Sequence, residues 1–159
     1  MELDGKIALI TGGAQGIGRI ISEELAGQGA HVILGDVNLE GAEKTAGEIK
    51  SSGGKASAVR IDVSNAADVK SVFDSIIKEY KPVDIVVNNA GITRDGLLVR
   101  MKEVDWDLVL NINLKEYQNI ENLTITGEKR KSYEKQIKKI IKLKEKISYI
   151  KSYLPDDIR

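Results

Sequence analysis

Residues 6–18 read Lys-Ile-Ala-Leu-Ile-Thr-Gly-Gly-Ala-Gln-Gly-Ile-Gly, and this stretch decides the fold. Its first part is a short continuous apolar run, which is typical of a β-strand buried on both faces of a parallel sheet. Its second part is a glycine-rich loop that opens a helix, because apolar residues recur at helical spacing from Gly16 to about Gly27. A strand, a glycine loop and a helix in this order form the context that a phosphate-binding loop requires.

Each glycine of this loop has a separate physical function. Gly12 permits the tight turn, Gly16 lets the backbone approach a pyrophosphate, and Gly18 allows the helix to pack closely on the sheet. The amino-terminal end of the helix offers free N–H groups and the positive end of a dipole. Because turns also use glycine, a turn without a ligand is the alternative interpretation.

Strands and helices continue to alternate along the first 115 residues. The apolar patterns predict further strands at 31–36, 56–61 and 83–88, and helices at 39–51 and about 102–114. Between the last two strands lies one more helix, which Asn65 can cap and Pro82 ends. This alternation implies βαβ units with right-handed crossovers. The predicted fold is therefore α/β, a Rossmann-like doubly wound parallel sheet of about four strands.

Ligands of such sheets bind beyond the carboxyl ends of the strands, and Asp36 stands at one of these ends. It follows the glycine loop by about 20 residues, where a carboxylate can accept hydrogen bonds from the ribose hydroxyls of adenosine. The same charge would repel a 2′-phosphate, and residues 35–39 contain no Lys or Arg. The pattern favours NAD over NADP as the cofactor. The alternative is that Asp36 only caps the following turn.

The composition excludes several classes of protein. The chain has no cysteine, which excludes disulfides and thiolate metal sites, and its single histidine, His31, excludes a histidine-cluster metal site. We expect no metal. No run approaches the ~18 apolar residues of a membrane span, and the amino terminus lacks the features of a signal peptide. We therefore expect a cytoplasmic protein that does not enter a membrane.

Four motifs stand in the order and spacing of one family. They are the Thr-Gly-x-x-x-Gly-x-Gly loop at 11–18, Asp62-Val63, Asn88-Asn89-Ala90-Gly91 and Asn111-Ile112-Asn113-Leu114. With these motifs, residues 1–115 resemble the short-chain dehydrogenase/reductase family. Within it, the stretch from residue 91 to residue 101 looks most like the 3-oxoacyl-[acyl-carrier-protein] reductases of fatty acid synthesis.

The resemblance implies an NAD(P)-dependent oxidoreductase and a set of cofactor-binding residues. These residues are Gly12, Gln15, Gly16, Ile17, Gly18, Asp36, Asp62, Val63, Asn89, Ala90 and Gly91. By the same resemblance, the backbone of 12–18 cradles the diphosphate, residues 62–63 flank the adenine, and residues 89–91 line the nicotinamide ribose. Asn113 matches the asparagine of the catalytic Asn-Ser-Tyr-Lys tetrad, which holds a helix kink and a proton-relaying water. A helix C-cap is the alternative for Asn113.

The rest of this tetrad has no counterpart in the sequence. None of the five tyrosines is followed four residues later by a lysine, and no serine stands in the context that the family uses. Without the tyrosine acid, carbonyl reduction loses roughly 10²- to 10⁴-fold of general acid catalysis. The resemblance therefore implies a nucleotide-binding half that would reduce an acyl thioester only if a catalytic half were supplied.

Residues 116–159 have a different composition from the rest of the chain. They contain no alanine or valine and 11 of the 24 basic residues, and Glu128 to Leu154 has the pattern of a basic amphipathic helix. We expect a dinucleotide-binding domain at 1–115 and a lysine-rich helical tail at 116–159 that resembles no known family. Packing or self-association through helices would cover the otherwise unpaired edge of the fourth strand. Nucleic acid is the less favoured partner, because no recognised binding module accompanies the lysines.

Three hypotheses for the function stay open at this point. The first is a reductase-derived protein that binds a dinucleotide without efficient turnover. The second is a nucleotide-binding scaffold whose tail recruits a protein partner. The third is a fusion or frameshift product, in which the tail was never selected to work with the domain.

Overall fold

The structure is a computed structural model that describes residues 2–94, 100–116 and 119–120. The chain divides into two compact units, Met1–Gly91 and Ile92–Arg159, and each is described by itself. The first unit contains four strands and three helices. They are β1 (Ile7–Thr11), α1 (Gly16–Gly27), β2 (His31–Asp36), α2 (Leu39–Ser51), β3 (Lys55–Arg60), α3 (Ala66–Glu79) and β4 (Ile85–Val87).

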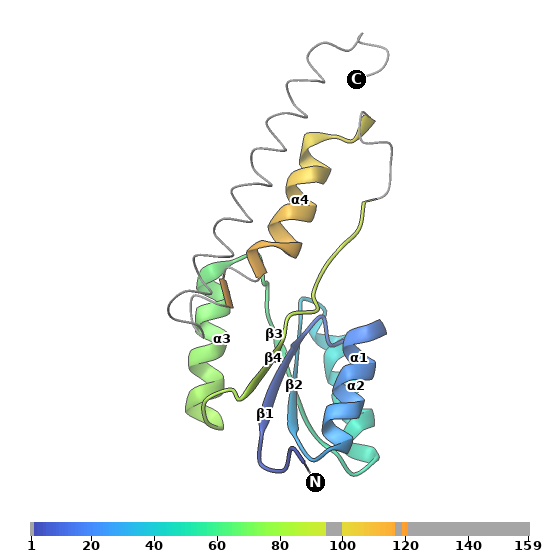
Figure 1. The fold of residues 1–159 in the computed structure, drawn as a ribbon, viewed down its shortest axis with the longest axis vertical. Helices are drawn as coiled ribbons and strands as arrows, with labels where there is room; N and C mark the ends of the chain where they lie inside the picture. The colour runs from blue at the N-terminus through green and yellow to red at the C-terminus, as the bar shows by residue number, and fades with distance from the viewer. Residues whose placement is uncertain (1, 95–99, 117–118, 121–159) are drawn as a thin grey trace. The chain divides into compact units, whose positions relative to one another are not determined.

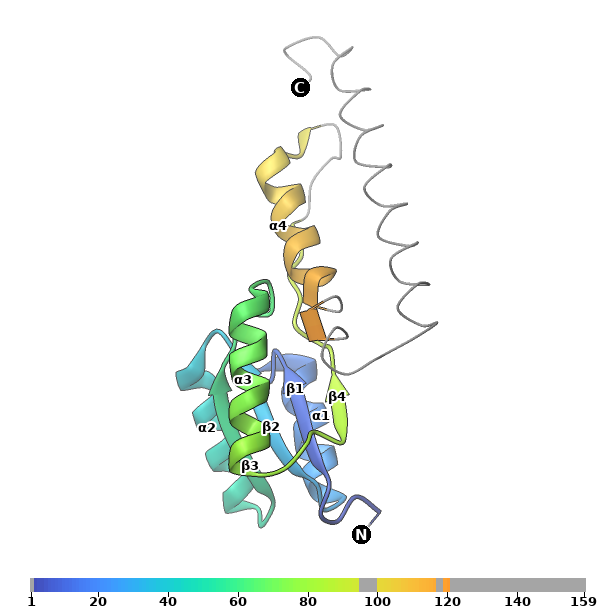
Figure 2. The same cartoon turned by 90° about the vertical axis from the view of Figure 1, so that its left-hand side faces the viewer.

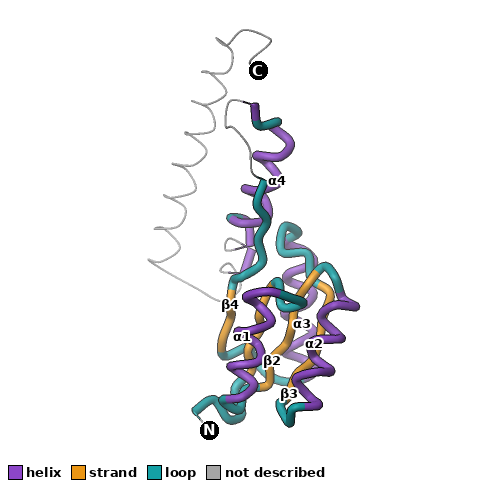
Figure 3. Tube along the Cα trace, turned by 90° about the vertical axis from the view of Figure 1, so that its right-hand side faces the viewer, coloured by secondary structure: helices purple, strands orange, loops and turns teal. Residues whose placement is uncertain are grey.

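The four strands form one parallel sheet in the order β3-β2-β1-β4. The helices α1 and α2 cover one face of this sheet and α3 covers the other, as the three views in Figures 1, 2 and 3 show. The chain runs outward from β1 to β3 and then returns to β4 on the opposite side of β1. This reversal between β1 and β4 is the point at which doubly wound sheets bind their ligands. The predicted α/β, Rossmann-like fold is confirmed.

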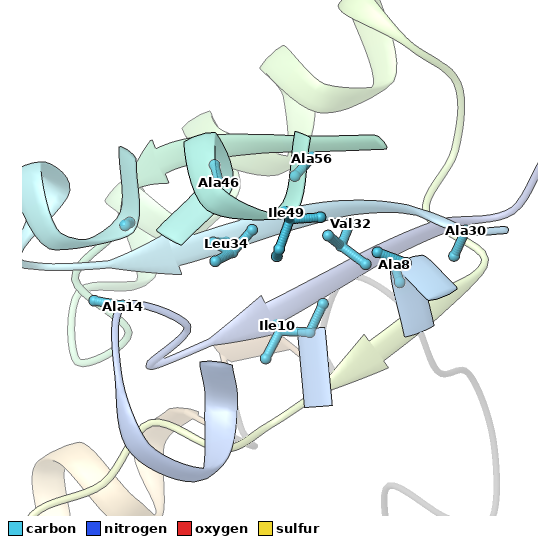
Figure 4. Packing of buried hydrophobic residues seen from close by; sticks show 11 residues of the cluster. Ala8, Ile10, Ala14, Ala30, Val32, Leu34, Ala46, Ile49 and Ala56 are labelled. Atoms are coloured by element: carbon cyan, nitrogen blue, oxygen red, sulfur yellow. The ribbon is translucent and has the colours of Figure 1, made fainter. Parts of the chain in front are cut away.

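Buried aliphatic side chains fill both faces of the sheet, since all five residues of β1 are buried. Alternate residues point to opposite faces, so Ile10 packs towards α1 and α2 while Leu9 is buried on the α3 side. Figure 4 shows Ile49 of α2 lying against the side chains of β2. The core cluster on the α1 and α2 side consists of Ala8, Ile10, Ala14, Ala26, Ala30, Val32, Leu34, Ala42, Ala46, Ile49 and Ala56.

Most predicted boundaries agree with the structure to within a residue or two, but β4 is shorter than expected. It spans three residues rather than the six of 83–88. The side chain of Asp84, rather than a further ladder bond, receives the N–H of Ile7 just before the strand. Just after it, Asn89 donates its N–H to the hydroxyl of Thr11. Asp84 still donates its own N–H to the carbonyl of Ile7 (2.9 Å), so side chains take over only part of the hydrogen bonding between β4 and β1 at the ends of this strand.

The strand β4 lies at the edge of the sheet, as expected, and within the described part of the chain it pairs with β1 alone. What covers its other edge stays a prediction.

The described part of the second unit contains the helix α4 (Glu103–Asn113), close to the predicted 102–114. The predicted basic helix at 128–154 lies outside the described residues. The boundary at residue 115 stays a prediction. Among the residues that are described, no helix combines the length and the apolar character needed to cross a bilayer.

Candidate functional site: a dinucleotide-binding loop at the carboxyl ends of the strands

The glycine loop between β1 and α1 turns by placing two glycines in the left-handed region. Gly12 has φ +63° and Gly16 has φ +56°. A Cβ at Gly12 would lie 2.9 Å from Nδ2 of Asn89, so the turn is both strained for other residues and closely packed. A Cβ at Gly16 would meet no atom within 4 Å, which means that this part of the backbone faces open space. A ligand can therefore approach the backbone at Gly16.

Gly18 lies at the closest approach between α1 and the loop. A Cβ there would overlap the carbonyl oxygen of Gly12 and lie 2.6 Å from Nδ2 of Asn89. The close packing predicted for Gly18 is present, but its neighbour is the loop rather than the sheet. The atoms that this Cβ would meet belong to Gly12 and Asn89, and neither residue lies in a strand.

The amino-terminal end of α1 lacks a side-chain cap. Gln15 occupies the N-cap position and its side chain makes no capping bond, whereas Asn38 and Asn65 cap α2 and α3 through their side-chain oxygens. This confirms the cap predicted at Asn65. The side chain of Ile17 is 71% exposed. Because the first N–H groups of a helix have no intrahelical acceptor, α1 presents unsatisfied donors and positive dipole charge.

Two other amides of the loop are already engaged within the protein. Gly13 donates its N–H to the carbonyl of Gly35 (3.2 Å), and Ala14 donates its N–H to Oδ2 of Asp36 (3.1 Å). The part of the predicted cradle that is left for an anion is therefore narrower than 12–18. The backbone around residues 15–18, at the start of the helix, is the part of this cradle that lies beside the open space at Gly16.

The carboxylate of Asp36 is held beside the glycine loop. Its Oδ2 accepts the Ala14 N–H, and its Oδ1 accepts the N–H of Asn38 at 3.0 Å, two residues further along the chain. The turn-capping contact, which was the alternative interpretation, is thus present. A carboxylate has about four acceptor positions, so these two bonds leave capacity for ribose hydroxyls. The fixed position of Asp36 next to the loop is what the binding of adenosine ribose requires.

Thr11 and Asn89 connect the glycine loop to the end of β4. The fully buried hydroxyl of Thr11 donates to the carbonyl of Val87 (3.3 Å) and accepts the N–H groups of Asn89 and Ala90, each at 3.0 Å. The side chain of Asn89 donates to the carbonyls of Thr11 (2.8 Å) and Gly12 (3.3 Å). The amide nitrogen of Asn89 therefore fixes the loop.

No separate role of Thr11 was predicted from its sequence context. The available signal was a hydroxyl residue at the buried end of a strand, directly before the loop.

The pair Asp62 and Val63 lies between β3 and α3. Oδ1 of Asp62 accepts the N–H of Ser64 at 3.0 Å and its hydroxyl at 2.6 Å, and the N–H of Asp62 donates to Oδ2 of Asp68 at 2.7 Å. Val63 is buried. Ile61 donates its N–H to the carbonyl of Asp36, so this pair continues the same edge of the sheet. Three hydrogen bonds therefore hold the backbone and the side chain of Asp62 in this turn.

Asn113 belongs to the second unit, at the end of α4. Its Oδ1 accepts the N–H of Ile92 and its Nδ2 donates to the carbonyl of Ile92, both at 2.9 Å. The side chain thus pairs with the backbone in the manner of a neighbouring strand, and these bonds hold Ile92 to the end of the helix. The loop, Asp36, Asp62, Val63 and residues 89–91 all belong to the first unit.

The chain matches the family of short chain dehydrogenases over residues 6–132. It is 42% identical over 125 residues to the 3-oxoacyl-[acyl-carrier-protein] reductase FabG of Thermotoga maritima, which covers 79% of this chain and 51% of that protein. It is 44% identical over 114 residues to the FabG protein of Escherichia coli, over 72% of this chain and 46% of that one.

Among solved structures, it is similar to a short chain dehydrogenase/reductase from Burkholderia phymatum in complex with NAD. The TM-score is 0.72 at 32% identity, over 77% of this chain and 43% of that one.

The chain spans about half the length of the curated relatives that it matches. The match to the family also continues past residue 115, into the segment that we expected to resemble no family. The glycine loop, the parallel sheet and these similarities agree with one another. The chain belongs to the short-chain dehydrogenase/reductase family.

Proposed function

We propose that this chain binds a nicotinamide adenine dinucleotide through the glycine loop and Asp36, as the nucleotide-binding portion of a reductase of the 3-oxoacyl-[acyl-carrier-protein] type. The observation that carries the proposal is the uncapped amino end of α1, next to the open space at Gly16. A diphosphate would supply the acceptors that this helix end lacks, while the other two helices of the first unit already have caps.

The cofactor in this proposal is NAD rather than NADP. The carboxylate of Asp36 would accept hydrogen bonds from the ribose hydroxyls, and its charge would repel a 2′-phosphate. No Lys or Arg stands between residues 35 and 39 to offset that repulsion. The adenine would lie against Asp62 and Val63, and residues 89–91 would flank the nicotinamide ribose.

The proposed activity is binding without efficient turnover. The printed sequence has no tyrosine followed four residues later by lysine, so it lacks the acid that protonates the alkoxide formed on hydride transfer. Asn113 would act as a positioning residue through its two bonds to Ile92. An acyl thioester would be reduced only if a catalytic half supplied the tyrosine and the lysine. A cytoplasmic location and self-association through helices stay predictions.

A scaffold function is the second candidate, favoured by the position of β4. Its edge has no strand partner among the described residues, and an unpaired edge strand can accept another chain. A pull-down with the full chain and with a version ending at residue 115 tests this candidate. A partner retained only by the full chain would support the tail as the recruiting segment.

The proposal is tested by titrating the full chain with NADH and, separately, with NADPH, followed by fluorescence. The decisive variant is Gly16→Ala, and its matched control is Gly53→Ala. Both glycines have positive φ (+56° and +87°) and open space around the missing Cβ, so both substitutions introduce a similar backbone strain of about 1 kcal/mol. Only Gly16 lies at the start of α1. We expect Gly16→Ala to weaken NADH binding at least tenfold and Gly53→Ala to leave it unchanged.

Asp36→Asn separates the ribose function from the turn-capping function. The amide keeps an acceptor oxygen for the turn and loses the negative charge. If the charge selects against the 2′-phosphate, the NADH-to-NADPH affinity ratio should fall by about tenfold, equivalent to ~1.4 kcal/mol. An unchanged ratio would show that Asp36 only caps the turn. Absence of saturable binding by the folded wild-type chain would overturn the proposed function as a whole.

A further inference from the structure

Thr45 is a buried hydroxyl residue that none of the contacts described above includes. It lies in the middle of α2 and is 2% exposed. Its Oγ1 donates to the carbonyl of Ala14 at 2.9 Å, across 31 positions of the chain. Ala14 belongs to the glycine loop and is part of the core cluster in Figure 4. A side chain of α2 therefore holds the loop that precedes α1.

The hydrogen bond of Thr45 differs from those of other hydroxyls on helices of this fold. Ser22, Ser51 and Ser75 each donate to the carbonyl four residues earlier, within their own helix. This is the usual local bond of a hydroxyl inside a helix. Thr45 bonds to a different element instead. Its hydroxyl therefore serves the contact between α2 and the loop.

Ala14 has a hydrogen-bond partner on each side of its α-carbon. Its N–H donates to Oδ2 of Asp36 at 3.1 Å, and its carbonyl accepts from Thr45. The helix α2 also approaches the residue closely, because a Cβ added at Gly41 would lie 3.2 Å from Cβ of Ala14. Both peptide groups that flank Ala14 are thus fixed, one by the end of β2 and one by α2.

The bond from Thr45 also sets the direction of the next N–H group. The carbonyl of Ala14 and the N–H of Gln15 belong to one planar trans peptide group, in which they point in opposite directions. Because the carbonyl points to the buried Thr45, the N–H of Gln15 points away from it. Gln15 is the exposed N-cap residue of α1 and lies next to the open space at Gly16.

We propose that Thr45 is a positioning residue for dinucleotide binding, whose hydroxyl fixes the Ala14–Gln15 peptide group so that its N–H is available to the diphosphate. This inference rests on the proposed function and adds to it a residue from outside the glycine loop. Without the hydroxyl, the buried carbonyl of Ala14 has no donor, which favours rotation of the peptide group towards another partner. The N–H of Gln15 turns with it.

The experiment titrates the full chain and three variants with NADH, followed by fluorescence, under conditions in which urea unfolding shows each protein to be folded. Thr45→Val keeps the branched shape and removes the hydroxyl, whereas Thr45→Ser keeps the hydroxyl. Ser51→Ala is the matched control, because its hydroxyl also donates from α2 to a carbonyl at 2.9 Å, but within the helix. We expect Thr45→Val to raise the dissociation constant about tenfold, and the other two variants to stay within about twofold of the wild type.

Hydrogen exchange of the wild-type chain gives a second measurement that needs no variant. The amide of Gln15 should exchange about tenfold more slowly in the NADH-saturated chain than in the free chain, because it then donates to a diphosphate oxygen. The amide of Ala14 already donates to Asp36 in the free chain and should change less. This measurement decides the question even if Thr45→Val fails to fold.

Three outcomes would overturn the positioning role and leave dinucleotide binding intact. The first is wild-type affinity for NADH in Thr45→Val. The second is a loss of affinity in Thr45→Ser or Ser51→Ala as large as that in Thr45→Val. The third is exchange at Gln15 that NADH does not slow. Absence of saturable NADH binding by the folded wild-type chain would instead overturn the proposed function, and this inference with it.

Discussion

The two ends of the parallel sheet differ in how far their polar groups find hydrogen-bond partners within the chain. At the carboxyl ends, the backbone around Gly16 faces open space and α1 begins without a side-chain cap. At the amino ends, the carboxylate of Asp84 accepts bonds from one backbone N–H and two lysines, and His31 is bonded through Ser57 to Tyr80. One end leaves donors for a ligand, and the other satisfies its polar groups within the chain.

This difference implies that the carboxyl end of the sheet contributes less to the stability of the ligand-free protein than the amino end does. A helix without a side-chain cap is less stable by about 0.5–2 kcal/mol than a capped one, and a bound anion at α1 would offset that loss. The hydrogen bonds at the amino end hold β1, β2, β3 and α3 together whether or not a ligand is present. The carboxyl end should therefore respond most to ligand, and the amino end most to pH.

The largest expected effect is that of Gly18→Ala at the carboxyl end. The new methyl group would overlap the carbonyl of Gly12 and crowd the side chain of Asn89. Because these neighbours are backbone and a bonded amide, the loop must move, at a cost of about 3 kcal/mol in the free energy of unfolding. Urea unfolding measures this loss, and NADH titration should show that binding is lost with it.

Gly47→Ala is the matched control for Gly18→Ala. Gly47 also lies in a helix, α2, but a Cβ there would meet no atom within 4 Å and its φ is ordinary. Alanine should therefore stabilise the protein by about 0.5–1 kcal/mol. If both substitutions changed the unfolding free energy in the same direction, the close approach at Gly18 would not be the cause.

Thr11→Val should have the next largest effect. Valine keeps the shape of threonine and removes the buried hydroxyl that accepts from Asn89 and Ala90. Two partly buried N–H groups would lose their acceptor, which costs about 2 kcal/mol in the free energy of unfolding. NADH binding should weaken as well, since the end of β4 would no longer be fixed to the loop.

Ser75→Ala provides the comparison for Thr11→Val. Its hydroxyl donates to the carbonyl of Ser71 on the exposed side of α3, so its removal should change the unfolding free energy by only a few tenths of a kcal/mol. Equal losses in the two variants would show that the Thr11 hydroxyl has no special function in fixing the loop.

The features predicted correctly from the sequence are those with a local cause. The bounds of α2 and the cap at Asn65 depend on residues within a few positions of one another, and both are confirmed. The Thr11 contacts join residues nearly 80 positions apart. A local sequence pattern cannot predict contacts between residues so far apart in the chain. The use of the Ala14 N–H by Asp36 was missed for the same reason, because it depends on how the loop lies against β2.

In the candidate site, too, the features with a local cause were predicted and those that depend on distant residues were not. The glycine motif predicted the loop and its tight turn, and the structure places Gly12 and Gly16 at positive φ, which glycine adopts without strain. It did not show which amides of the loop are left free, since Gly13 and Ala14 find partners on a neighbouring strand. The individual ligand contacts of Gln15, Ile17, Asp62 and the other residues of the site stay predictions until a dinucleotide is bound.

The smallest expected effect is that of Asp84→Asn at the amino end. The N–H of Ile7 (2.9 Å), then Lys81 and Lys6, hold the pKa of the Asp84 carboxyl well below its usual range. A lowered pKa in the folded state means a contribution to stability that is complete above the unfolded pKa of about 3.9 and is lost as the pH falls below it. Because solvent screens the exposed lysine pairs, the effect at pH 7 should be smaller than that of Thr11→Val.

Urea unfolding of wild type and Asp84→Asn at pH 7 and at pH 3 measures this contribution. The wild type should be the more stable of the two at pH 7, and the difference should narrow at pH 3, where this carboxylate takes up a proton in the unfolded chain while it stays charged in the folded one. Asp74→Asn is the control, since Asp74 pairs only with Lys70 on the exposed side of α3 among the contacts described for it. A wild-type advantage that is the same at both pH values would mean that the amide replaces the carboxylate at Ile7 and that charge has no part in holding β1 to β4.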